Sequence, residues 1–137
     1  MITIENTLGF KAHQHVADLL SKNKENAKEL KAIYNEATEL PLIFLEQEMI
    51  MGYQKIHVKK KRFKTLFFDD DFFPVQNQDA DWPDVHEKLA ELSFFENHLY
   101  LGRTIMMAEE IKKAAQIMIK PVLDKLTQSQ KDGGKNE

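Results

Sequence analysis

The sequence contains no cysteine among its 137 residues. Disulfide bonds, thiolate nucleophiles and the zinc or iron–sulfur sites that need cysteine ligands are therefore excluded. Its apolar runs are short, and two of them, Pro41–Leu45 and Met49–Met51, are separated by three polar residues. Both are far shorter than the roughly 20 apolar residues of a membrane-spanning helix, so we expect no membrane association. Since the N-terminus lacks a basic segment followed by an apolar one, we expect a cytoplasmic protein.

The chain also lacks the residue patterns of common catalytic and cofactor sites. Its serines, Ser21, Ser93 and Ser129, have no flanking glycines of a nucleophile elbow, and its five glycines form neither a phosphate-binding loop nor a dinucleotide fingerprint. No histidine follows a glutamate by three residues, the ligand spacing of metal sites in helical bundles. We therefore predict no catalytic residue, no metal ligand and no cofactor, and expect a non-enzymatic protein.

Apolar residues recur at helical spacing along most of the chain, which predicts an all-α protein. A first stripe starts at Leu8 behind Asn6 or Thr7 as the N-cap. A second, capped by Asn23, ends at Pro41, because proline cannot donate the next backbone hydrogen bond. A third helix then begins at Pro41. The whole predicts a small bundle of about four to five helices.

Two short β elements compete with this interpretation. Residues Met1–Glu5 alternate enough for a short N-terminal strand. Residues 54–68 could form a hairpin of Gln54–Val58 with Phe63–Phe68. The turn of that hairpin, Lys59–Arg62, contains no Gly, Asn, Asp or Pro, which favours a continuous helix over this segment.

The C-terminal half predicts one long helix that begins near Asp81 or Trp82, with Pro83 in its first turn. Its expected buried stripe starts with Val85, Leu89, Leu92, Phe95 and Leu99. Gly102 either weakens this helix or allows a neighbour to approach closely. Pro121 is expected to kink it.

The last residues of the chain differ in composition from the rest. Residues 127–137 are polar and include Gly133-Gly134. We therefore predict one helical domain over residues 1–126, followed by a disordered tail over 127–137.

Charge is strongly segregated in the middle of the chain. Residues 55–64 carry six basic and no acidic side chains, namely Lys55, Lys59, Lys60, Lys61, Arg62 and Lys64. On a helix, Lys55, Lys59 and Arg62 would share a face that could neutralise phosphates, and Phe63 beside them could stack on a base. Nucleic-acid binding through residues 55–64 is therefore an alternative function.

An acidic segment follows directly. Residues 65–98 carry nine acidic side chains and one basic one. Carboxylates spaced over residues 69–96 could imitate phosphates and inhibit a nucleic-acid enzyme, which is a second alternative. The set Asp84, Glu87, Glu91 and His98 falls on one predicted helix face opposite the apolar stripe, so exposure to solvent explains it better than a metal site.

Nine of the thirteen aromatic residues lie between Phe63 and Tyr100. The adjacent pairs matter most, because two neighbours on one helix cannot both face a narrow core. Phe72 and Phe73 follow three aspartates, so this segment either buries the rings or presents them to a partner. The predicted partner-binding residues are Asp69, Asp70, Asp71, Phe72, Phe73 and Trp82.

These observations favour a non-enzymatic protein that binds another protein. It would act as an adapter, an inhibitor or an assembly factor, of the kind common in bacteria and phages. Another protein is the expected partner. A nucleic acid and a homo-oligomer remain open as alternatives.

Overall fold

The computed structural model describes residues 3–59, 61–68, 72–75 and 79–135. These residues form α1 (Ile4–Lys22), α2 (Ala27–Val58), the 3-10 helix η1 (Lys61–Phe67), α3 (Trp82–Ala90) and α4 (Phe94–Lys135). No strand occurs among them, which confirms the all-α bundle with a long C-terminal helix. The hairpin at 54–68 and the N-terminal strand are wrong, since helical residues occupy 54–58, 61–67 and 4–5.

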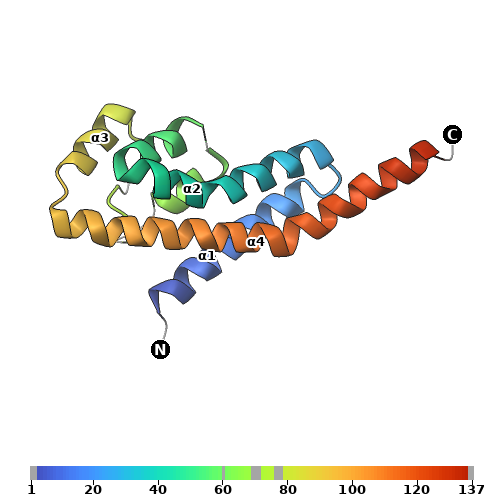
Figure 1. Cartoon of the computed structure of the whole chain (residues 1–137), viewed down its shortest axis with the longest axis horizontal. Coiled ribbons are helices and arrows are strands. Elements are labelled where there is room, and N and C mark those ends of the chain that lie inside the picture. The colour runs from blue at the N-terminus through green and yellow to red at the C-terminus, as the bar shows by residue number, and fades with distance from the viewer. Residues whose placement is uncertain (1–2, 60, 69–71, 76–78, 136–137) are drawn as a thin grey trace.

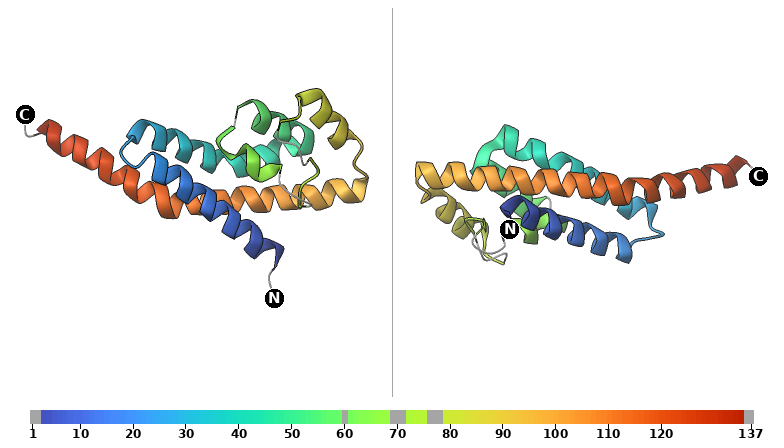
Figure 2. Two further views of the ribbon diagram at one scale, coloured as in Figure 1. Left: turned by 180° about the vertical axis from the view of Figure 1, so that it is seen from behind. Right: turned by 90° about the horizontal axis from the view of Figure 1, so that it is seen from below.

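Helix α4 forms the long axis of the molecule, and α1 and α2 pack along it (Figures 1 and 2). The core consists mainly of apolar side chains from these three helices and from η1, such as Leu8, Leu30, Phe63 and Ile111, and α3 adds Val85 and Leu89. Helix α3 lies at one end of the molecule, beside the start of α4 (Figure 1). At the other end, α4 extends beyond the other helices (Figure 1). Its first turns and α3 therefore form a corner of the fold.

The caps of the first two helices differ from the predicted ones. Thr3 rather than Asn6 or Thr7 caps α1, since its hydroxyl accepts a hydrogen bond of 3.1 Å from the Asn6 backbone amide. Asn23 follows the end of α1, and Asn26 caps α2 by accepting from the Glu29 amide at 3.1 Å. Short polar side chains cap equally well at several positions, so the packing of the helices decides among them.

Helix α2 does not end at Pro41, as the sequence predicted. Pro41 is buried inside the helix, and Leu40 and Phe44 belong to the core, so packing offsets the lost backbone hydrogen bond. The chain bends instead at Glu48, whose backbone has φ 61° and ψ −161°. This conformation costs about 1–3 kcal/mol in a residue other than glycine. The helix predicted to begin at Pro41 is therefore not separate: its first residues belong to the first limb of α2, and the second limb begins after Glu48.

The bend lets two distant turns of α2 touch. Eight residues of straight helix span about 12 Å, yet a Cβ added at Gly52 would lie 2.7 Å from the Phe44 ring. That ring packs against Tyr53 and Phe67, with centroid distances of 5.8 and 5.4 Å. Gly52 is therefore required by the close approach of Phe44.

The single long helix predicted after Asp81 is also wrong, because α3 ends at Ala90 and α4 starts at Phe94. Ser93 and Glu96 form a capping box at this start. The Glu96 amide donates to Ser93 Oγ at 3.1 Å, and the Ser93 amide donates to Glu96 Oε1 at 3.0 Å. The new helix directs Phe95 and Leu99 outward, although they were assigned to the core stripe.

Helix α4 continues through Pro121 to Lys135. It changes direction in its C-terminal half (Figure 1), and the kink at Pro121 itself stays a prediction. The structure thus extends helix into the predicted tail 127–137, where each residue added to an existing helix forms its hydrogen bond without a new nucleation step. Residues 136–137 lie outside the described part. The disorder predicted for residues 127–137 and the domain limit predicted at residue 126 stay predictions.

Two glycine substitutions should have opposite effects. Gly102→Ala should raise the free energy of unfolding by up to about 1 kcal/mol, because no atom lies within 4 Å of the added Cβ and alanine favours a helix. Gly52→Ala should lower the free energy of unfolding by about 1–3 kcal/mol, because the added Cβ would clash with the packed Phe44 ring. The higher helix propensity of alanine offsets part of this loss. Urea unfolding of both variants measures this. Stabilisation by Gly52→Ala would contradict the bend.

Candidate functional site

The structure divides the basic surface predicted over residues 55–64. Helix α2 ends at Val58, so Lys55, Lys59 and Arg62 do not share one helix face. Lys59 and Lys61 are exposed, whereas Lys64 Nζ lies 5.6 Å from the centroid of the Phe68 ring. Lys60 lies outside the described residues.

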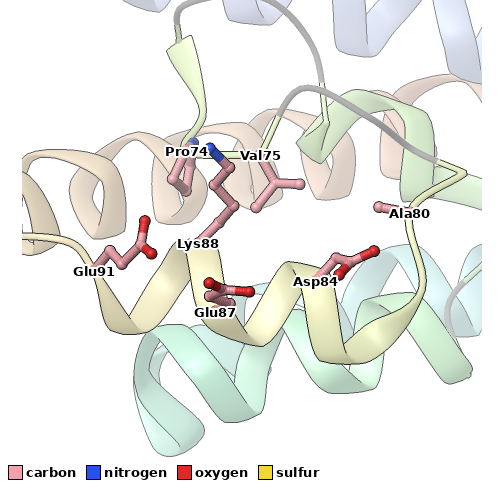
Figure 3. Close-up of a pocket in the computed structure, with 7 residues that line it drawn as sticks. All are labelled: Pro74, Val75, Ala80, Asp84, Glu87, Lys88 and Glu91. Atoms are coloured by element: carbon pink, nitrogen blue, oxygen red, sulfur yellow. The ribbon is translucent and has the colours of Figure 1, made fainter.

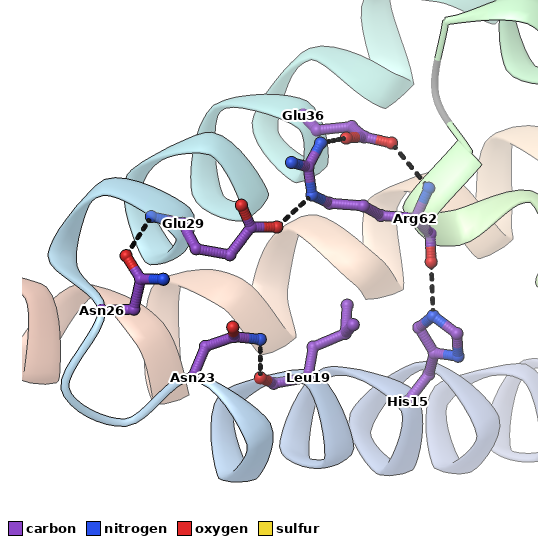
Figure 4. A network of polar contacts seen from close by, with 7 residues as sticks. All are labelled: His15, Leu19, Asn23, Asn26, Glu29, Glu36 and Arg62. Atoms are coloured by element: carbon purple, nitrogen blue, oxygen red, sulfur yellow. Dashed lines mark hydrogen bonds and ion pairs between the residues drawn. The ribbon is translucent and has the colours of Figure 1, made fainter.

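Arg62 is part of an internal polar network (Figure 4). Its Nε donates to Glu29 at 2.8 Å and its Nη1 donates to Glu36 at 2.7 Å. Its backbone amide also donates to Glu36 at 3.2 Å, and its carbonyl oxygen lies 2.6 Å from His15 Nε2. Arg62 thus joins η1 to both α2 and α1. Phe63 beside it is fully buried and cannot stack on a base.

The charges of this network stabilise one another. The Glu36 side chain is only 5% exposed, so its carboxylate depends on Arg62 for a countercharge. The hydrogen bond from Arg62 lowers the pKa of Glu29, and the hydrogen bonds to Glu29 and Glu36 raise the pKa of Arg62. These contacts account for Arg62 as a structural residue.

The predicted partner-binding aromatics are largely packed inside. Phe73 is 1% exposed, and its ring lies 6.0 Å from that of Phe67. Phe72 is half-buried between Lys11 Nζ, at 5.6 Å from the ring centroid, and Arg103 Cζ, at 5.8 Å. Asp69, Asp70 and Asp71 lie outside the described residues. Phe73 therefore belongs to the core.

Trp82, the remaining predicted partner-binding residue, starts α3 and is half-buried. Its ring lies 6.1 Å from the ring of His57 and 5.9 Å from that of His86. His57 Nε2 in turn lies 2.9 Å from the carbonyl oxygen of Ala80. Trp82 thus helps to hold α3 against the end of α2.

The first turns of α4 carry the exposed aromatics. Phe94 is 81% exposed, Phe95 74% and Leu99 40%. At about 100° per residue, Phe95, Leu99, Gly102 and Met106 fall within roughly 60° of one another, and we call them the α4 apolar face. The opposite side of the helix is buried and includes Thr104, Met107 and Ala108. Phe95, Leu99 and Gly102 therefore point away from the core, whereas Met106 at the end of this face is partly buried against it.

The sequence contained a signal for this face that periodicity alone did not reveal. The Ser93-x-x-Glu96 spacing is that of a capping box, which marks the start of a new helix. A helix that starts there need not continue the apolar stripe of α3. The hydrogen bonds from the backbone and side chain of Ser93 also lower the pKa of Glu96.

An acidic cleft of about 610 Å³ lies beside α3 (Figure 3). Pro74, Val75 and Ala80 line one side, and the α3 side is lined by Asp84, Glu87 and Lys88, with Glu91 just beyond the helix. The three carboxylates are exposed. Apolar walls with carboxylates at the rim suit the aliphatic stem and charged head of a lysine or arginine side chain. We call this site the acidic cleft.

A metal site and a membrane-spanning helix are two further possibilities for a helical chain. Within the described ranges, no three histidine, aspartate or glutamate side chains lie close enough to hold a metal ion. In the same residues, no helix combines the length and apolarity needed to cross a membrane. Comparison of the chain with protein-family models, with curated proteins and with solved structures finds no match.

Proposed function

We propose that this chain is a non-enzymatic protein that binds another protein through the start of α4. One observation carries this proposal. Phe94, Phe95 and Leu99 are exposed within six residues of a helix whose start is held by a capping box. Aromatic side chains contribute much of the binding energy of protein interfaces. A rigid helix that already presents them loses little conformational entropy on binding.

The remaining exposed apolar side chains are single residues, apart from Leu42 and Leu45, which lie three residues apart on α2 and include no aromatic ring. In the described part of the chain, the other large ones are Phe10, Leu42, Leu45, Met51, Val58 and Ile117. Single exposed apolar residues are normal on protein surfaces, whereas a contiguous apolar patch marks an interaction site. The Phe94 ring contacts His98 edge to face at 4.4 Å but remains largely exposed. The start of α4 is therefore the better candidate.

The two nucleic-acid hypotheses have less support. Arg62 is engaged with carboxylates, and Phe63 is buried, so the basic segment lacks two of its proposed contacts. Mimicry of phosphates by residues 69–96 stays a prediction, with Asp84, Glu87 and Glu91 as exposed carboxylates. Neither hypothesis accounts for exposed phenylalanines.

A capture experiment with matched variants tests the proposed function. The purified full chain is used to capture proteins from lysate of the source cell, and these are identified by mass spectrometry. Phe95→Ser with Leu99→Ser should abolish capture of the specific partner without lowering the melting temperature, because both side chains are exposed. Ile117→Ser, on the same helix and 65% exposed, serves as the control and should retain it. Equal capture by all three proteins would refute the proposal.

A further inference from the structure

The α4 apolar face has the spacing of a seam between two helices. Its residues follow one another at intervals of four, three and four, as in coiled-coil packing. Gly102 leaves a gap in the middle of this face, and no atom lies within 4 Å of its absent Cβ. A glycine inside a helix costs about 1 kcal/mol relative to alanine. A partner backbone that approaches α4 closely at Gly102 supplies a reason for that cost.

Carboxylates border the α4 apolar face at both ends. Glu91 and Glu96 lie near its start, and Glu109 follows Met106 by three residues. Residues 79–99 carry six carboxylates and one lysine, a net charge of −5. Arg103, the arginine next to this face, directs Nη1 toward the Phe72 carbonyl oxygen at 3.4 Å. The surface at the start of the α4 apolar face is therefore negative, and it complements a positively charged partner.

A second copy of this chain fits the face less well. An antiparallel pair centred between Leu99 and Gly102 would set Glu91 of one copy near Glu109 of the other, whereas Glu110 is already paired with Lys113 at 3.3 Å. A parallel pair in register would set each of these glutamates against itself. Like charges brought together across an interface are destabilising. A partner helix that carries basic residues avoids this repulsion.

We infer that the partner presents an amphipathic helix with lysine or arginine on its flanks. This helix packs along the α4 apolar face and places a small residue over Gly102. The inference rests on the proposed function and specifies the chemistry of the partner. Glu91, at the rim of the acidic cleft, is three residues from Phe94, so the two Cα atoms lie at most about 11 Å apart. This carboxylate of the acidic cleft therefore lies close to the start of α4.

Two synthetic helical peptides of about 18 residues, roughly 27 Å long, test this chemistry. Both carry leucines at intervals of three and four with one central alanine, and their remaining positions are lysine in one and glutamate in the other. Titration calorimetry with the full chain should show binding of the lysine peptide that weakens as salt is raised. The glutamate peptide should bind at least about tenfold more weakly.

Variants locate the binding. Gly102→Leu should weaken binding of the lysine peptide by about tenfold, because the leucine side chain fills the gap in the face. The melting temperature should not fall, because this surface is open. Glu91→Gln with Glu109→Gln should flatten the salt dependence. Ile117→Ser should bind as the unaltered chain does. Equal affinity of the chain for both peptides would overturn the inference. So would unchanged affinity of Gly102→Leu, or of the double variant Phe95→Ser with Leu99→Ser, for the lysine peptide.

Two further outcomes separate the inference from the proposed function. Failure of the lysine peptide to bind, while Phe95→Ser with Leu99→Ser still abolishes partner capture, overturns the basic helix and leaves the proposed function standing. Sedimentation that shows a dimer of the full chain, dissociated by the same double variant, identifies a second copy as the occupant and also overturns it. Loss of both peptide binding and variant-dependent capture removes inference and function together.

Discussion

Replacing Phe73 with alanine is expected to lower the free energy of unfolding by about 3–5 kcal/mol. The ring is 1% exposed, and it packs with Phe67 in the core cluster. Removing it leaves a cavity in addition to the lost burial of apolar surface. Guanidinium unfolding monitored by circular dichroism measures the change.

Two matched variants serve as controls for the Phe73→Ala measurement. Phe72→Ala should cost less, because this ring is only half-buried, and Phe95→Ala should change stability by less than about 0.5 kcal/mol, because its ring is 74% exposed. If Phe73→Ala instead leaves stability unchanged, the segment 72–75 is not packed as described. The hypothesis that Phe72 and Phe73 dock a partner would then be restored.

Arg62→Ala is expected to lower the free energy of unfolding by about 2–4 kcal/mol. Removing one member of a buried ion pair typically costs about 3–5 kcal/mol, and we take a lower range because the Arg62 side chain is 35% exposed. The loss arises from Glu36, whose 5% exposed carboxylate would be left without its countercharge. Lys61→Ala, at an exposed neighbouring position, is the control and should have almost no effect.

A second substitution and a pH series identify the cause of this loss. Glu36→Gln in the Arg62→Ala background should recover part of it, because an unpaired amide is less costly to bury than a carboxylate. The folded-state pKa of Glu29 lies below its ordinary value of 4.5, so its contribution is present above that pH and is lost as the pH falls through the folded-state pKa. Arg62→Ala should remove this contribution. An unchanged pH dependence would contradict the Glu29 contact.

The helical class of this protein follows from its sequence because helical hydrogen bonds connect residues four apart, so local apolar spacing predicts them. Helix caps are also determined by residues close together in sequence, so the Ser93-x-x-Glu96 capping box could have been recognised at the start of α4. The absence of cysteine likewise excludes disulfides and cysteine-ligated metal sites in any fold that the chain could adopt.

Only the tertiary structure decided where α2 bends and which charged and aromatic side chains point inward. Pro41 remains helical because Leu40 and Phe44 beside it are buried in the core, and the bend falls at Glu48. Arg62 is drawn from a basic segment to carboxylates 33 and 26 residues earlier in the chain. The adjacent phenylalanines at 72–73 and 94–95 look alike in sequence, yet Phe73 is buried and Phe95 is exposed. Burial depends on contacts between residues far apart along the chain, which local spacing does not encode.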